Sequence, residues 1–186
     1  AVVYGVLLAL YNGGFITLFT DAIIVNIGIN IIAAVGLNLI IGFSGQFSLG
    51  HAGFMAIGAY SCAIITSSNP TYGGFIMGLL VGMVVSGLVA YVVGLPTLRL
   101  KGDYLAIATL GIAEIIRILI VNFRDITNGP SGIFGLPQVT TWEVVFVFAL
   151  ISIILVSNLM NSAPGRAILS VREDEIAAEA MGINTT

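Results

Sequence analysis

The chain has 186 residues, 58% of them hydrophobic and 8% charged, with a formal net charge of −3 at pH 7. Soluble domains carry roughly 25% charged residues, so this composition excludes a protein whose whole surface faces water. The small net charge does not suggest a nucleic-acid partner. The single cysteine cannot form a disulfide within these residues. The sequence also contains only one histidine, so a metal site is not expected.

Four long apolar segments follow one another along the chain, at residues 22–42, 74–94, 104–122 and 142–160. Each has about 20 residues, and a helix of that length spans roughly 30 Å, the thickness of the hydrocarbon core of a bilayer. Residues 51–66 form a shorter apolar stretch. Residues 1–11 have no basic leader or cleavage pattern, so we interpret them as the end of a helix. The sequence predicts an all-α, polytopic transmembrane helix bundle with about five to six spans.

Basic residues predict the orientation of the chain in the membrane. Four of the six fall in two connections that an odd-even count of spans places on the same side: Arg99, Lys101, Arg166 and Arg172. Cytoplasmic connections are enriched in basic residues, so both are expected to be cytoplasmic. The sequence thus predicts a transmembrane domain over residues 1–160, incomplete at both ends, and a cytoplasmic segment over residues 161–186.

The segment 74–94 carries a small residue at every fourth position: Gly74, Gly78, Gly82, Ser86, Ala90 and Gly94. Side chains four apart form a ridge along a helix. In a membrane, small ridges let a neighbouring backbone approach closely. We predict that this ridge packs against another helix, either in the same chain or in another subunit.

The stretch GFSGQFSLGHAGF, residues 42–54, interrupts two apolar segments with glycines and polar residues. One interpretation is a helix broken at membrane depth, as in transporters, which would line a substrate pathway. The residues involved would be Gly45, Gln46, Ser48, Gly50 and His51. The other is an interfacial cytoplasmic loop, in which Ser48 caps the next helix and His51 is hydrogen-bonded locally. These residue types leave both interpretations open.

Two charged residues, Glu114 and Arg117, lie inside the apolar segment 104–122. Charges at bilayer depth are costly and are usually paired and functional. A spacing of three places both on one helix face, where they can form an ion pair. Glu114 is therefore either a carboxylate of the substrate pathway or half of a structural ion pair.

The polar tail predicts a short helix over residues 171–181. Ser170 and Glu173 have the spacing of a capping box, and Gly182 can follow the helix end. Val171, Ala178 and Met181 are expected along one side. A helix this short is marginal alone, so it either docks into a groove of a partner or serves as a solvated connector.

Three blocks resemble the signature regions of LivM-type permeases of branched-chain amino acid ABC importers. They are GLNLIIGFSGQFSLGHAGFMAIGAY, LPTLRLKGDYLAIATLGIAEIIRIL and GRAILSVREDEIAAEAMGI, in the order of the family, within residues 33–183. The resemblance implies a permease of the bacterial or archaeal cytoplasmic (inner) membrane. It also implies a second permease subunit, two cytoplasmic ATPases and an extracytoplasmic solute-binding protein, which the outward loop 127–132 would contact. A family member would continue with further spans, so the chain is expected to be a fragment.

The resemblance also implies a coupling region over residues 165–182, where the tail would contact an ATPase. The residues concerned are Gly165, Arg166, Arg172, Glu173, Glu175, Ala177, Ala178 and Gly182. The general ABC pattern places a glutamate directly before two alanines, whereas here Ile176 intervenes after Glu175. No GxxxxGK[ST] motif occurs, so the chain is expected to bind no cofactor itself, with ATP and Mg²⁺ on the partner subunits.

The sequence therefore predicts a transport subunit and not an enzyme, because no nucleophile–base pair or metal-ligand set can be assembled. Its expected cargo is branched-chain amino acids, with urea, short amides or sugars as the alternative within the same class. A channel or carrier driven by a gradient is a rival, favoured only by Glu114 and His51 as possible proton carriers. A purely structural membrane subunit is a third possibility.

Overall fold

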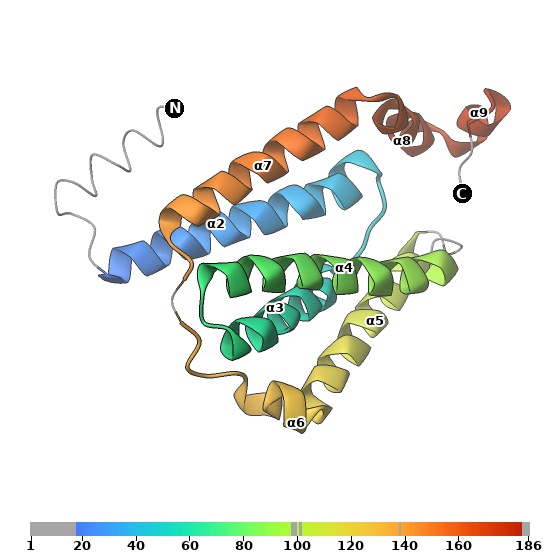
Figure 1. Ribbon diagram of the computed structural model, residues 1–186. Helices are drawn as coiled ribbons and strands as arrows, with labels where there is room; N and C mark the ends of the chain where they lie inside the picture. Colours follow the sequence, from blue (N-terminus) through green and yellow to red (C-terminus); the bar gives the residue numbers. More distant parts are fainter. Residues whose placement is uncertain (1–17, 98–99, 101, 138, 184–186) are drawn as a thin grey trace. The chain divides into compact units, whose positions relative to one another are not determined.

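The computed structural model describes residues 18–97, 100, 102–137 and 139–183 (Figure 1). These residues fold almost entirely into helices, with no β-strand among them. The elements are α2 (Leu18–Asn38), the π-helix η1 (Leu39–Phe43), α3 (His51–Ser68), α4 (Tyr72–Thr97), α5 (Asp103–Asn122), α6 (Arg124–Thr127), the 3-10 helix η2 (Gly129–Ser131), α7 (Trp142–Asn161), α8 (Ala163–Glu173) and α9 (Glu175–Ala180).

Within the described part of the chain, four helical segments are long and apolar enough to cross a membrane: Phe19–Phe43, Tyr72–Thr97, Asp103–Asn122 and Trp142–Asn161. Each of these helical segments contains one of the four apolar segments that the sequence predicts. The predicted all-α, polytopic fold is therefore confirmed, and the protein is a multi-pass membrane protein. The apolar residues 1–11, and the basic residues Arg99 and Lys101 used to predict orientation, lie outside the described residues.

The chain forms two compact units, and the first comprises residues 1–39 and 140–166. Within it, α2 and α7 pack side by side and run in the same direction (Figure 1). Gly28 of α2 lies directly against Val145 of α7, which is buried. A glycine at this crossing allows the close approach that membrane helices use in place of a hydrophobic driving force.

The second unit comprises residues 40–139 and 167–186, and α3 packs against both α4 and α5 in it (Figure 1). The ridge of small residues on α4 lies on α3: a Cβ added to Gly78 would be 3.0 Å from the carbonyl oxygen of Cys62. A Cβ on Gly82 would be 2.8 Å from the carbonyl oxygen of Gly58. The ridge therefore packs within the chain, a choice that the sequence left open.

The tail differs from its predicted form. Instead of one helix over residues 171–181, α8 extends to Glu173 and α9 begins after a break at Asp174. The Asp174 carboxylate accepts hydrogen bonds from the backbone amides of Ile176 and Ala177, both at 3.0 Å, so Asp174 is the N-cap. The predicted capping box was wrong, because Ser170 lies inside α8 and its hydroxyl donates to the carbonyl oxygen of Ala167.

Candidate functional site

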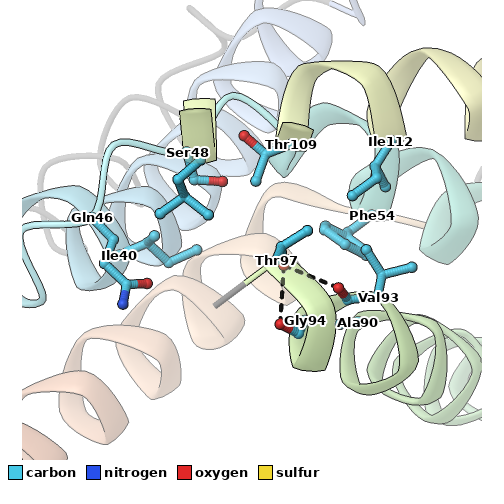
Figure 2. Close-up of a pocket in the computed structure, with 11 residues that line it drawn as sticks. Ile40, Gln46, Ser48, Phe54, Ala90, Val93, Gly94, Thr97, Thr109 and Ile112 are labelled. Carbon is cyan, nitrogen blue, oxygen red and sulfur yellow. Dashed lines mark hydrogen bonds between the residues drawn. The ribbon is translucent and has the colours of Figure 1, made fainter. Parts of the chain in front are cut away.

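A cavity of about 200 Å³ lies in the second unit, where the loop after η1 meets the start of α3 and the facing ends of α4 and α5 (Figure 2). It is lined by Ile40, Gln46, Ser48, Phe54, Ala90, Val93, Gly94, Thr97, Leu105, Thr109 and Ile112. Most of these side chains are apolar, and the loop adds the amide of Gln46 and the hydroxyl of Ser48. The wall thus suits a small ligand with an apolar part and a few polar groups.

The two threonines of the cavity wall already make hydrogen bonds to the backbone. The hydroxyl of Thr97 lies 3.0 Å from the carbonyl oxygens of both Val93 and Gly94 (Figure 2). The hydroxyl of Thr109 donates to the carbonyl oxygen of Ala106 and accepts from the amide of Leu49, each at 3.0 Å. Thr109 thus joins α5 to the loop and fixes one side of the cavity.

The loop 44–50 is attached at both of its ends. At its start, the hydroxyl of Ser44 and the amide of Gln46 donate to the carbonyl oxygen of Ile40, at 2.8 and 3.3 Å. At its end, buried Gly50 packs on α5, where an added Cβ would be 3.1 Å from the carbonyl oxygen of Thr109. Gly45 has φ +69°, a conformation that favours glycine. Backbone geometry therefore accounts for Gly45, and close packing for Gly50.

The five sequence candidates of this stretch lie in or next to the loop, although one detail differs from the predictions. α3 begins at His51 with Gly50 as its N-cap, so Ser48 does not cap the helix; its hydroxyl only accepts from the amide of Gly50, at 3.4 Å. The Nε2 atom of His51 is buried and finds no hydrogen-bond partner among the described residues. The interpretation in which His51 is hydrogen-bonded locally therefore gains no support from its Nε2 atom.

Glu114 and Arg117 form the ion pair that their spacing suggests. Arg117 Nε donates to Glu114 Oε2 at 2.9 Å, and Arg117 Nη2 to Glu114 Oε1 at 2.6 Å. Both side chains are largely exposed on α5, at 51% for Glu114 and 67% for Arg117. The pair lies apart from the cavity, whose lining does not include Glu114.

The residues of the expected coupling region fall on α8, α9 and the turn after them. Gly165 is buried against Leu159 and Met160, and Arg166 donates to the carbonyl oxygen of Asn161 at 2.9 Å. Arg172 instead contacts η1, just before the loop: its Nη1 donates to the carbonyl oxygen of Gly42 at 2.7 Å. Its Nη2 donates to the carboxylate of the neighbouring Glu173 at 2.6 Å.

The short helix α9 presents a different face from the predicted one. Ala178 is 4% exposed, whereas Ile176 and Met181 are more than 80% exposed. The break at Asp174 changes the helical register, so Val171 and Met181 no longer belong to one continuous face. Gly182 has φ +82° and ends the helix where the sequence predicts: its amide donates to Glu179, and the next amide donates to Ala178.

Sequence reasoning missed the cavity residues outside the glycine-rich stretch, Thr109 above all. Thr109 is 60 positions from the amide that it holds. A threonine in an apolar helix is common and has several backbone partners within reach, so no local pattern marks this one. Its role becomes visible only when α3 and α5 are packed together.

Comparison with known proteins decides the family. The family described as "Branched-chain amino acid transport system / permease component" matches residues 19–186. The chain belongs to this family. The match covers both units, the cavity and the tail, and it agrees with the resemblance of the three sequence blocks.

Two bacterial relatives carry the name high-affinity branched-chain amino acid transport system permease protein LivM. The chain is 37% identical to that of Salmonella typhimurium over 168 residues and 36% identical to that of Escherichia coli over 166 residues. These alignments cover 72% and 70% of the chain but only 39% and 38% of the relatives.

A probable LivM of Methanocaldococcus jannaschii is 28% identical over 135 residues, or 63% of this chain and 38% of that protein. The chain therefore spans well under half the length of the relatives it matches. No solved structure is similar enough to count as a match.

Proposed function

We propose that the chain is part of the membrane permease subunit of an ATP-driven importer that moves branched-chain amino acids across the cytoplasmic (inner) membrane. The observation that carries this proposal is the family match over residues 19–186, together with two LivM relatives that are more than 35% identical. The four apolar helices support the location in a membrane.

The cavity supports a small apolar cargo. At about 200 Å³ it is smaller than the roughly 300–1,000 Å³ of sites for drug-sized ligands. Its walls offer aliphatic and aromatic surface from Ile40, Phe54 and Ile112, with polar groups from Gln46 and Ser48 at the loop. An aliphatic amino acid has both kinds of surface. The cavity is accordingly a candidate resting place on the substrate pathway.

The remaining parts of the importer are proposed as partners: a second permease subunit, two cytoplasmic ATPases and an extracytoplasmic solute-binding protein. ATP and Mg²⁺ would bind to the ATPases, and this chain would contribute no catalytic group. Its α8 and α9 would contact an ATPase and transmit the movement of that subunit to the transmembrane helices. This movement would shift the population of the transporter between outward-open and inward-open states.

The test is leucine uptake into vesicles that contain the full-length permease with its neighbouring permease, ATPase and binding-protein subunits. ATP inside the vesicles should drive uptake, and excess urea should not compete. Leucine uptake that does not depend on ATP but depends on a proton gradient would assign the protein to gradient-driven carriers. ATP hydrolysis stimulated by the binding protein without leucine uptake would keep the importer class and change the cargo to another small polar solute.

A further inference from the structure

One side chain joins the tail, across 130 positions of sequence, to the end of η1 immediately before the loop 44–50. Nη1 of Arg172 donates to the carbonyl oxygen of Gly42 at 2.7 Å. Nη2 of the same guanidinium donates to Glu173 at 2.6 Å, which orients it. The side chain of Arg172 is 39% exposed, so it is partly enclosed by the chain.

The carbonyl oxygen of Gly42 is a group that needs a donor from outside its own helix. It lies in η1 (Leu39–Phe43), and the last carbonyls of a helix have no partner inside the helix. A basic side chain is favoured at this end, which carries partial negative charge. Neither α2 nor η1 has a basic residue in its last turn. Arg172 supplies that charge from the tail.

The aliphatic stem of Arg172 also contacts the loop, at Gly45. A Cβ added to Gly45 would lie 2.6 Å from Cγ and 3.3 Å from Cδ of Arg172. Gly45 also has φ +69°, which disfavours other residues. The guanidinium therefore holds the end of η1 and the stem holds the loop at Gly45, and any side chain at position 45 would displace Arg172.

The same loop forms part of the cavity wall immediately afterwards. Gln46 and Ser48 line the cavity, one and three residues beyond Gly45. At the far end of the loop, Thr109 holds Leu49 and packs against Gly50. Besides the bonds of Ser44 and Gln46 to Ile40, the loop is therefore attached to α5 through Thr109 and to α8 through Arg172. A movement of α8 would shift the loop at the Arg172 end while Thr109 holds the other end.

We infer that Arg172 is a positioning residue that ties the loop 44–50, and with it one wall of the cavity, to the position of α8. Its hydrogen bond to Gly42 and its stem contact with Gly45 are both within its own chain. The inference rests on the proposed function, because it assumes that an ATPase moves α8 and α9. In this role Arg172 touches neither substrate nor nucleotide and acts only through the loop.

The first experiment measures the mobility of the loop in the assembled, full-length transporter. Phe47 is 54% exposed and does not line the cavity, so Phe47→Cys can carry a nitroxide label in a Cys62→Ala background without other cysteines. Arg172→Met keeps the stem and removes the donors, and the label should become several-fold more mobile. The matched control is Arg166→Met on the same helix, which removes only the bond to Asn161 and should leave the label unchanged. An equally ordered label in Arg172→Met would overturn the inference.

The second experiment measures ATP hydrolysed per leucine imported by the same transporter. Arg172→Met should raise this ratio several-fold, and Arg172→Lys, which retains a donor, should restore part of it. Gly45→Ala, which displaces the same side chain, should raise it similarly, and the double variant should be no worse than either single one. A mobile loop with an unchanged ratio would contradict the positioning role. Failure of the unaltered transporter to import leucine would instead count against the proposed cargo, while the label would still report the Arg172 contact.

Discussion

The two ends of the ridge on α4 have the same residue pattern but different surroundings. Gly78 and Gly82 are buried against α3 and Gly74 against Asn69 just after it, whereas nothing lies within 4 Å of a Cβ added to Gly94. The difference arises from α3, which begins only at His51 and is preceded by a loop. Where a helix faces the ridge, small residues allow close packing. Where the loop faces it, the same small residues leave space for a cavity.

The largest effect on stability is expected from filling the packed end. Gly78→Leu would push a side chain into the backbone of α3, where an added Cβ is already 3.2 Å from the Cα of Cys62. We expect a loss of about 3 kcal/mol, at the upper end of the cost of overpacking. Unfolding of the purified protein in detergent measures it. Gly87→Leu on the exposed side of the same helix is the control, and equal losses in both variants would contradict the packing described here.

A smaller loss is expected from detaching the loop at the cavity end. Thr109→Val keeps the shape of the side chain but removes the acceptor for the amide of Leu49. The cost should be about 1 kcal/mol, the usual net value of one hydrogen bond. Hydrogen exchange at the Leu49 amide should become faster. The control is Thr97→Val, which removes a hydroxyl that bonds only within α4 and should not change the exchange rate at Leu49. An unaltered exchange rate in Thr109→Val would show that other contacts hold the loop.

The boundary between the two ends is marked by Ser86. Its hydroxyl donates to the carbonyl oxygen of Phe54 at 3.3 Å, joining α4 to the first turns of α3. Ser86→Ala should cost about 0.6 kcal/mol, the average for hydrogen bonds between membrane helices. Ser86→Thr retains the hydroxyl and serves as the comparison in the same unfolding assay. If Ser86→Ala is as stable as the unaltered protein, close packing alone joins the helices at this point.

The smallest effect on stability is expected from filling the open end, where function should suffer instead. Gly94→Leu meets no neighbour and should change stability by no more than about 0.5 kcal/mol. The new side chain would occupy the cavity that Gly94 lines, so leucine uptake should fall by about tenfold. Gly87→Leu, which lies outside the cavity, should leave uptake intact. Full uptake by Gly94→Leu would remove this cavity from the substrate pathway.

Much of the fold follows from local features of the sequence. Each apolar segment of about 20 residues is a helix, because a chain in lipid must satisfy its backbone hydrogen bonds internally. The ion pair of Glu114 and Arg117 forms because residues three apart share a helix face. Gly182 ends α9 because it can adopt a positive φ. The tail was predicted less well, since Ser170 and Asp174 are both able to cap a helix and the sequence does not rank them.

The candidate site was predictable only in part. The glycine-rich stretch identified Gln46 and Ser48, but not Thr109 or the facing end of α4. The role of Arg172 in the coupling region stays a prediction, and no sequence pattern indicated that its side chain also reaches the carbonyl oxygen of Gly42 in its own chain. These contacts join residues far apart in the sequence, 60 positions for Thr109 and Leu49 and 130 for Arg172 and Gly42, and local patterns carry no information about such pairs.

The sequence by itself determined the solvent, the helical class, the family and the presence of a small-residue ridge, because each depends on composition or on residues a few positions apart. Only the tertiary structure decided that the ridge packs on α3, that it opens into a cavity at one end, and that Arg172 reaches Gly42. The physical reason is that a ridge of small residues can pack against any close neighbour, and a guanidinium can donate to any free carbonyl oxygen. Which neighbour it meets is set by how the helices are packed.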